Sequence, residues 1–587
     1  MLRTESRDPV SSALSASARR LAGVAVISGA INLLMLSGSL YMLQVYDRVL
    51  PGRSVATLIG LSAIVLLAYA FQSYFEAARS RMLARIGTLF DTSLEAPIHQ
   101  ALATLPLRGA KPSAAQQPLR DLDQIRFFLS GMGPTAFLDM PWIPLFLIAL
   151  FVFHPVIGLT ACAGAAAIVT MTLVTERRTK DSAKLANDVS AERQVLADAT
   201  RQNAEVLRAL GMTARFTARF KAANERYLAE NASVSDTYAN LGAVAKGLRY
   251  VLQSAILGIG AYLVIVEQAS GGIMIASSIM MGRALAPIEV ALANWKQLTA
   301  ARAAIDRLRE VLTATAPPEA PAVALPRPRE SLIVEDLSVT VPGGDKVVVS
   351  NVSFRLTAGM GLALLGASAA GKSSLSRALA GIWPASKGVI RLDGAALDNW
   401  APDELGKHIG YLPQDVALFD GTVAENIARF DPDATSQGIL AAARLAGAHE
   451  MILRLPNGYA TRIGERGASL SGGQRQRVGL ARAVYGNPFL VILDEPNANL
   501  DRDGELALLK AIETLRQRRS IVVLVSHRPD AIAALNIALV LYDGRMIAFG
   551  PREEIFARVA QAAKQPAVPR VVRAEQAMPR RSQGAPA

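Results

Sequence analysis

The segment LSGGQRQR occupies residues 470–477 and leads into a stretch, GQRQRVGLARAVYG, that has the apolar spacing of a helix. Ser471 stands at the expected helix start, where its hydroxyl and the first free backbone N–H groups attract an anion. The segment LVILDE, residues 490–495, follows, and its apolar residues predict a buried strand that ends in two carboxylates. This combination favours an α/β domain that binds a nucleotide.

A phosphate-binding loop precedes both segments. Residues 366–373, GASAAGKS, match the P-loop pattern, follow the apolar run LALLG and open the helical stretch SSLSRALAGI. In such a loop the backbone wraps a phosphate chain, Lys372 reaches the β- and γ-phosphates, and the hydroxyl of Ser373 binds Mg²⁺. The predicted nucleotide-binding residues of the loop are Gly366, Ala367, Ser368, Ala369, Ala370, Gly371, Lys372, Ser373 and Ser374.

Two carboxylates complete the predicted site. Asp494 and Glu495 emerge at the end of their strand, where Asp494 is placed to hold Mg²⁺ through water and Glu495 to polarise the attacking water. Phosphoryl transfer depends on such positioning and charge neutralisation rather than on covalent catalysis. A core strand with a capping carboxylate is the simpler alternative, and the P-loop makes it the weaker one.

The C-terminal part of the chain has the pattern of parallel strands with crossover helices. Runs rich in β-branched residues, such as 332–341 and 520–527, alternate with helical stretches, which predicts an α/β nucleotide-binding domain over residues 331–563. Before it, the proline-rich residues 313–330 predict an interdomain linker. After it, the basic residues 564–587 predict a disordered tail.

The N-terminal part is apolar and predicts a membrane domain. A helix needs about 20 apolar residues to cross the hydrocarbon core of a bilayer. Candidate spans lie near 22–46, 54–76, 132–153, 156–175, 249–266 and 269–291. We therefore expect an all-α six-helix transmembrane domain over residues 21–312, with long cytoplasmic helical extensions, behind a polar segment 1–20 that is poorly ordered or an interfacial helix.

Charge and cysteine content indicate the orientation of the chain in the membrane and exclude some kinds of partner and bond. The arginines before the first span and the Lys- and Arg-rich loops 76–131 and 176–248 place both termini in the cytoplasm by the positive-inside rule. The net charge of +13 is spread along the chain, so no nucleic-acid partner is expected, only the lipid bilayer. The single cysteine, Cys162, excludes an intrachain disulfide.

The order of the motifs resembles the nucleotide-binding domain of ABC transporters. By this resemblance Gln414 in GYLPQD is the Q-loop glutamine, linked to Mg²⁺ and water, and His527 is the switch histidine that contacts the γ-phosphate. Asp501 resembles the D-loop aspartate. The signature that closes on ATP bound by the opposite subunit is formed by Ser471, Gly472, Gly473 and Gln474.

The same resemblance implies a homodimer and an exporter. The chain shows one P-loop and one signature, so a shared ATP site requires two copies. TRIGERG, residues 461–467, resembles the X-loop of exporters. A membrane domain fused before the nucleotide-binding domain is also typical of exporters. One residue departs from the pattern: Val341 stands where an aromatic residue that stacks on adenine is expected, which puts nucleotide affinity and base selectivity in doubt.

The membrane half narrows the resemblance to one kind of exporter. Residues 120–158 and 271–308 look like the permease-ATPases of type I secretion systems, specifically the PrtD-like subgroup. That subgroup implies the inner membrane of a Gram-negative bacterium, a periplasmic membrane fusion protein and an outer-membrane TolC-like channel. It also implies export of proteins with C-terminal secretion signals, such as proteases, lipases and repeat proteins. A lipid or drug flippase of the same architecture and a regulatory ATP-binding channel are the alternatives.

Three charged residues fall within the predicted spans or at their ends: Asp139, Arg283 and Glu289. Such residues are costly in a bilayer unless they face a polar cavity or a partner. We expect Arg283 and Glu289 to line the substrate channel, with Asp139 as a further candidate. Structural ion pairs that lock helices together are the competing interpretation.

Overall fold

The structure is a computed structural model that describes residues 8–110, 117–316, 325–464 and 467–564. The chain divides into two compact units, Met1–Pro317 and Pro318–Ala587. The division falls inside the predicted linker 313–330. Residues 1–7, part of that linker and the tail 565–587 lie outside the described residues.

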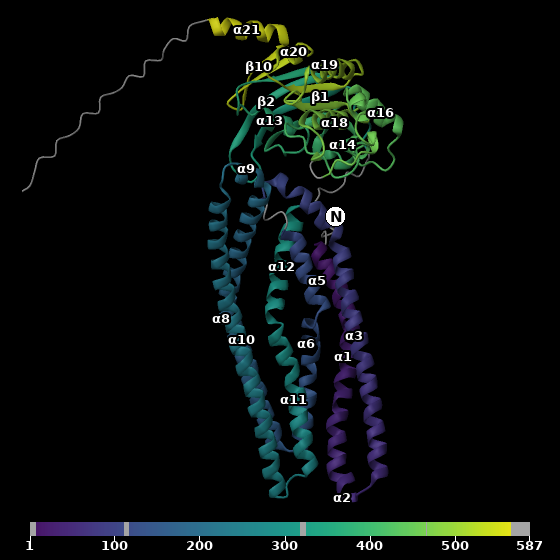
Figure 1. The fold of residues 1–587 in the computed structure, drawn as a ribbon, viewed down its shortest axis with the longest axis vertical. Helices are drawn as coiled ribbons and strands as arrows, with labels where there is room; N and C mark the ends of the chain where they lie inside the picture. Colours follow the sequence, from purple (N-terminus) through teal and green to yellow (C-terminus); the bar gives the residue numbers. More distant parts are fainter. Residues whose placement is uncertain (1–7, 111–116, 317–324, 465–466, 565–587) are drawn as a thin grey trace, which may run out of the picture. The chain divides into compact units, whose positions relative to one another are not determined.

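The first unit is helical throughout its described residues (Figure 1). Its elements in chain order are α1 (Pro9–Gln44), η1 (Val45–Val49), α2 (Leu50–Gly52), α3 (Val55–Thr104), η2 (Pro106–Arg108), α5 (Gln117–Ser130), α6 (Gly133–Asp139), η3 (Met140–Trp142), α7 (Ile143–Phe153), α8 (Pro155–Gln202), α9 (Ala204–Ala209), α10 (Thr213–Ile265), α11 (Gly271–Ala293) and α12 (Trp295–Ala314).

The apolar helices coincide with the six predicted spans. Five stretches of helix are long and apolar enough to cross a membrane, and a shorter apolar helix, Pro155–Met171, begins α8. Helices α3, α8 and α10 continue far beyond their apolar parts, as expected for the loops 76–131 and 176–248. The N-terminal segment differs from expectation: α1 begins at Pro9 and runs without a break into the first span.

Prolines explain where the third span breaks. Helices α6 and α7 are separated by the 3₁₀ turn η3, which contains Pro141, and Pro144 follows at the start of α7. A proline cannot donate the backbone hydrogen bond that a continuous helix needs. The break turns Trp142 against α1, where a Cβ atom at Gly29 would lie 2.5 Å from the indole ring. Only glycine permits this close approach.

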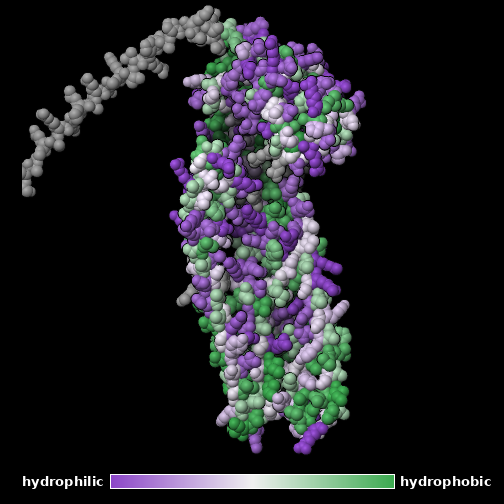
Figure 2. Space-filling model, viewed as in Figure 1, coloured by the Kyte–Doolittle hydropathy of each residue, from purple (hydrophilic) through white to green (hydrophobic). Residues whose placement is uncertain are grey.

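Burial separates the interior helices of the first unit from the exposed ones. In the 18-residue apolar stretch of α11, 50% of the residues are buried within the unit. In the corresponding stretch of α3, 6% are buried. Exposed apolar side chains of α3 include Ile59, Ile64, Leu66 and Leu67. In Figure 2 hydrophobic residues gather at the end of this unit that carries α2, which is the pattern of a lipid-facing belt.

The second unit contains a ten-stranded sheet with the order β5-β4-β1-β2-β10-β9-β3-β8-β7-β6. Its strands are β1 (Ser331–Thr340), β2 (Val347–Thr357), β3 (Gly361–Leu365), β4 (Lys387–Leu392), β5 (Ala395–Ala396), β6 (Ile409–Leu412), β7 (Leu490–Asp494), β8 (Ile521–Val525), β9 (Ile537–Tyr542) and β10 (Arg545–Pro551). Strands β9, β3, β8, β7 and β6 are parallel neighbours, as predicted for buried crossover strands. The carboxyl ends of such strands form the ligand edge of an α/β sheet.

Helices cover this sheet around two apolar cores. The P-loop helix α13 (Lys372–Leu379) packs with Leu362 and Leu364 of β3 in one core. Ala363 faces the other core, because side chains alternate along a strand. The remaining helical elements are η4 (Leu397–Asn399), α14 (Pro402–His408), α15 (Val423–Ile427), α16 (Ser436–Leu445), α17 (His449–Leu453), η5 (Gly458–Ala460), α18 (Gly472–Val484), α19 (Arg502–Gln517), α20 (Pro529–Ala533) and α21 (Arg552–Lys564).

Candidate nucleotide site

The P-loop joins the carboxyl end of β3 to the start of α13. Gly366 and Gly371 have φ angles of 152° and 97°, which favour glycine, and Ala369 also has a positive φ of 65°. A Cβ atom at Gly366 would lie 2.4 Å from the carbonyl oxygen of Leu541. The ammonium group of Lys372 donates to the carbonyl oxygens of Gly366 and Ala367 at 2.8 and 2.9 Å. The loop is therefore already curled around its lysine.

Asp494 ends β7 beside this loop and is 2% exposed. Burial raises the pKa of its carboxyl group, whereas the hydroxyl of Ser373 and the charges of Arg377 and Lys372 act in the opposite direction. Its Oδ1 atom is buried without a hydrogen-bond partner. A buried, unpartnered carboxylate oxygen beside the hydroxyl of Ser373 fits a divalent cation.

Three predicted catalytic side chains, of Gln414, Glu495 and His527, come together directly after Asp494. The amide of Gln414 donates to Oε2 of Glu495 at 3.0 Å, and Nε2 of His527 lies 3.9 Å from Oε1 of the same carboxylate. Glu495 has a φ angle of 49°, a left-handed conformation that costs a residue with a Cβ atom roughly 1 kcal/mol or more. The turn aims the glutamate away from the strand and toward the glutamine and histidine.

The signature segment begins a helix, as predicted. Ser471 caps α18: its hydroxyl accepts from the backbone N–H of Gln474, and the Gln474 side chain accepts from the backbone N–H of Ser471. These two bonds satisfy the N–H groups of Ser471 and Gln474, so the N–H groups of Gly472 and Gly473, at the positive end of the helix dipole, are the donors that suit a phosphate.

The signature is held by the D-loop segment of its own chain. Arg477 of α18 forms an ion pair with Asp501, and Asp501 accepts from the backbone N–H of Gly504 and caps α19. These bonds lower the pKa of the Asp501 carboxyl group. A Cβ atom at Gly473 would lie 2.8 Å from the carbonyl oxygen of Asn499. Among the described residues, no hydrogen bond or ion pair joins the signature to the P-loop of the same chain.

The structure describes part of the predicted X-loop and all of the turn that contains Val341. The predicted X-loop is described only in part, because residues 465 and 466 of TRIGERG lie outside the described residues. Val341 begins the turn between β1 and β2, with its backbone N–H bonded to the carbonyl oxygen of Lys346 at 3.0 Å. Its half-buried side chain presents no aromatic face to a base.

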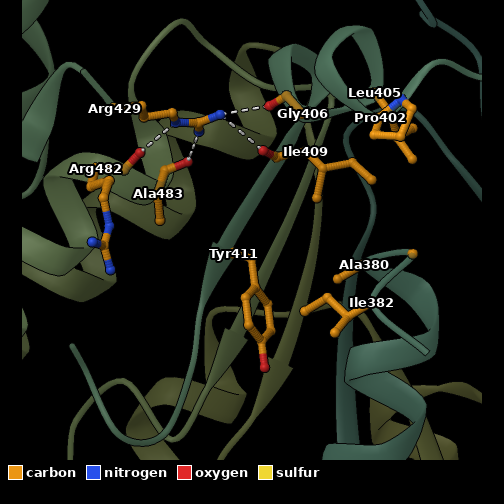
Figure 3. Close-up of a pocket in the computed structure, with 11 residues that line it drawn as sticks. Ala380, Ile382, Pro402, Leu405, Gly406, Ile409, Tyr411, Arg429, Arg482 and Ala483 are labelled. Atoms are coloured by element: carbon orange, nitrogen blue, oxygen red, sulfur yellow. Dashed lines mark hydrogen bonds between the residues drawn. The ribbon is translucent and has the colours of Figure 1, made fainter. Parts of the chain in front are cut away.

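A half-buried arginine that the sequence did not single out, Arg429, supports the predicted Q-loop. A pocket of about 400 Å³ lies beside β6, and Figure 3 shows the guanidinium of Arg429 among its lining residues, donating to four carbonyl oxygens. Two of these, of Gly406 and Ile409, precede or begin β6. The other two, of Arg482 and Ala483, lie near the end of α18. Arg429 therefore connects the signature helix to the strand that leads to Gln414.

Replacing Arg429 by methionine is expected to lower the free energy of local opening around β6 and the end of α18 by about 2–4 kcal/mol. The reason is that four carbonyl oxygens lose their donor, two of them on the buried residues Ile409 and Ala483. Hydrogen exchange of the full-length protein, followed over residues 404–412 and 478–486, measures the change. The exposed Arg518 provides a control, because Arg518→Met removes no buried bond. Equal protection in both variants would contradict the structural role of Arg429.

The structure places the three charged residues of the membrane unit in different surroundings. Asp139 accepts from Arg79 at 3.1 Å and from Asn32 at 2.9 Å, with side-chain exposures of 16% for Asp139 and 10% for Arg79. Glu289 lies 2.9 Å from Arg249 of α10. Arg283 is exposed in the single chain. For Asp139 this geometry favours the structural ion pair over the channel.

Comparisons with known proteins agree with this architecture. The family model described as ABC transporter transmembrane region matches residues 23–285, and the model described as ABC transporter matches residues 349–498. The chain is 51% identical over 537 residues to the type I secretion system ATP-binding protein PrsD of Rhizobium meliloti (strain 1021), covering 92% of each chain. It is 27% identical to the alpha-hemolysin translocation ATP-binding protein HlyB of Escherichia coli O157:H7, covering 92% of this chain and 77% of that one.

A solved structure supports the fold alone. A bacterial Atm1-family ABC exporter with ATP bound superposes with a TM-score of 0.79 at 22% identity, covering 94% of this chain and 98% of that one. The helical unit followed by the nucleotide-binding unit is thus the arrangement of a known exporter.

Proposed function

We propose a specific role for this chain from the premise that it belongs to the ABC transporter family, and within it to the ATP-binding permeases of type I secretion systems. It is a multi-pass membrane protein whose nucleotide-binding domain couples ATP hydrolysis to protein export. The proposal is that two copies form an exporter in the inner membrane, with both termini in the cytoplasm, and that the cargo carries a C-terminal secretion signal. The strongest support is the 51% identity to PrsD over 92% of both chains.

The similarity to type I secretion proteins also supports a proposal about partners. We propose that a periplasmic membrane fusion protein and an outer-membrane TolC-like channel continue the path beyond this chain. HlyB is named as an alpha-hemolysin translocation protein, which supports a protein cargo rather than a lipid or a drug. A flippase or a regulatory channel has no comparable support among these relatives.

In the proposed site, each side chain has one task. Lys372 and the P-loop N–H groups bind the phosphates, and Glu495 orients the attacking water with help from Gln414 and His527. Ser373, Asp494 and Gln414 would hold Mg²⁺, which neutralises phosphate charge. Among the described residues, no group of three or more His, Cys, Asp or Glu could hold a metal ion. This is compatible with Mg²⁺, which commonly uses one or two carboxylates plus substrate phosphates.

The dimer completes the site. In the proposed arrangement, Ser471, Gly472, Gly473 and Gln474 of one copy close on the γ-phosphate held by the P-loop of the other. The ion pair between Arg477 and Asp501 supports this proposal, because it fastens the signature to the D-loop so that both approach the partner's nucleotide together.

Introducing an aromatic residue at Val341 is expected to strengthen nucleotide binding. Val341→Tyr should lower the KM for ATP by about tenfold with little change in kcat, since a stacked base contributes roughly 1–3 kcal/mol. Steady-state hydrolysis by the purified full-length protein measures both constants. Val347→Tyr, at an exposed position after the same turn, is the control. An unchanged KM for Val341→Tyr would show that the base does not lie beside this residue.

A reconstituted secretion assay tests the proposed function. The chain is co-expressed with the fusion protein and outer-membrane channel of a type I system and with a protease that carries a C-terminal secretion signal. We expect the protease in the medium, and we expect its loss with Lys372→Ala or when the signal is removed. Export that continues without the signal would contradict the assignment of the cargo.

A further inference from the structure

A cavity of about 510 Å³ lies in the membrane unit between α10, α11 and the start of α12. This volume is within the range of ligand-binding pockets. Small residues of α10, among them Ser235, Ala239, Gly242 and Ala243, form one wall. A Cβ atom at Gly242 would meet no atom within 4 Å. The wall is therefore open and offers space for the backbone of an extended chain.

The charges of this cavity are unbalanced. The carboxylate of Glu289 is already paired with Arg249 at 2.9 Å. Lys246 and Lys296 also line the cavity, and neither forms an ion pair with a described carboxylate. Within the part of the chain that the structure describes, the ammonium group of Lys296 donates one hydrogen bond, to the side-chain oxygen of Asn231 at 3.4 Å. Lys246 is also attracted to Glu289, so Arg249, Lys246 and Lys296 share one carboxylate and the cavity keeps an excess of positive charge.

The lining of the cavity, which is open to solvent at Lys246 and Lys296, favours a polypeptide over a lipid. Glu289, Leu292 and Ala293 contribute the wall from α11, which is the most buried of the spanning helices. Lipid-facing helices of this unit, such as α3, instead expose long apolar side chains. A cavity walled by an interior helix and by alanine, serine and glycine is not the surface expected at an acyl chain.

We propose that this cavity binds an extended acidic segment of the exported polypeptide, whose carboxylates pair with Lys246 and Lys296. The inference rests on the proposed function, since it assigns a contact site to the cargo of that exporter. Lysine suits this task because its flexible stem carries a compact charge that pairs with a carboxylate in many geometries. A moving polypeptide requires contacts that depend on the charge of the side chain rather than on one fixed geometry.

The test measures binding of labelled peptides to the full-length protein in detergent by fluorescence anisotropy. The probe is a twelve-residue peptide of alternating aspartate and glycine, compared with one of alternating serine and glycine. Combining Lys246→Ala with Lys296→Ala is expected to weaken binding of the acidic peptide by about tenfold, as for the loss of two partly exposed ion pairs. Replacing both lysines by arginine should retain binding.

Two further variants separate charge from space. Gly242→Leu fills the open wall without changing charge and favours the helix, so it should weaken the acidic peptide while the protein stays folded. Lys221→Ala removes a lysine of α10 that pairs with Glu225 at the surface, and it should bind the peptide as the parent does.

Three results would overturn the proposal. One is equal affinity of the parent and the double alanine variant for the acidic peptide. Another is equal affinity of the parent for the two peptides. The third is affinity that depends on anionic lipid added to the detergent, which would assign the lysines to headgroups. The secretion assay remains independent of these outcomes: export with an unaffected peptide affinity refutes only this site, whereas no export refutes the proposed function itself.

Discussion

Glu495→Gln is expected to reduce the rate of ATP hydrolysis by about 10²–10⁴-fold, the usual contribution of a positioned proton acceptor. The glutamine keeps the size of the side chain and its contact with Gln414, but it cannot accept a proton from water. Binding of ATP should persist, because the P-loop and Asp494 are untouched. Phosphate release by the purified full-length protein measures the rate, and retention of labelled ATP measures binding.

The control for this variant is Glu513→Gln, at an exposed position of α19. It removes the same charge without touching the site, and its rate should equal that of the parent. If Glu495→Gln hydrolysed ATP as fast as Glu513→Gln, the catalytic assignment would be wrong. Loss of both hydrolysis and ATP binding would instead indicate that Glu495 supports the fold of the loop.

Asp139→Ala is expected to destabilise the membrane unit by about 3–5 kcal/mol, the cost of leaving a buried charge without its partner. Arg79 is the charge left behind, and among the described residues its one other hydrogen-bond partner is the hydroxyl of Ser28 at 3.2 Å. The measurement is thermal unfolding of the full-length protein in detergent.

A double variant distinguishes a structural role from a channel role. Combining Asp139→Ala with Arg79→Met removes both charges and should recover much of the lost stability, since buried ion pairs are often replaceable by apolar residues. Asp123→Ala breaks an exposed pair with Arg126 and should cost less than about 1 kcal/mol. If Asp139→Ala kept full stability and lost only export, the channel interpretation would regain support.

Local sequence signals were sufficient to predict the nucleotide-binding unit. The strand before the P-loop, the capped helix after Ser471 and the carboxylates after β7 are each specified by neighbouring residues, so the predicted strands agree with the observed ones within two residues. The six apolar spans were predictable for the same reason. Their composition alone meets the length requirement of a bilayer.

Long-range pairs could not be predicted in this way. Arg79 and Asp139 lie on different helices, and only the packing of α1, α3 and α6 brings them together. Arg429 likewise finds four carbonyl oxygens that the chain supplies from two distant segments. A positive residue in the sequence gives no indication of which carbonyl groups will surround it. For Arg477 the signal was present, since it follows the signature directly, but its partner Asp501 becomes evident only in the structure.

In the proposed exporter, two copies share each ATP, with the P-loop of one facing the signature of the other. Heterodimers purified through two different tags test it directly. In the first, one copy carries Lys372→Ala and the other carries Ser471→Arg. In the second, one copy carries both changes and the other carries none. ATP hydrolysis by each heterodimer is the measurement.

If the sites are shared, both defects of the first heterodimer fall on one site and the other site is intact, so hydrolysis persists. In the second heterodimer each site has one defect, so hydrolysis falls to the level of the Lys372→Ala homodimer. The opposite order, with an active second heterodimer and an inactive first, would mean that each chain uses its own signature and would contradict the shared site.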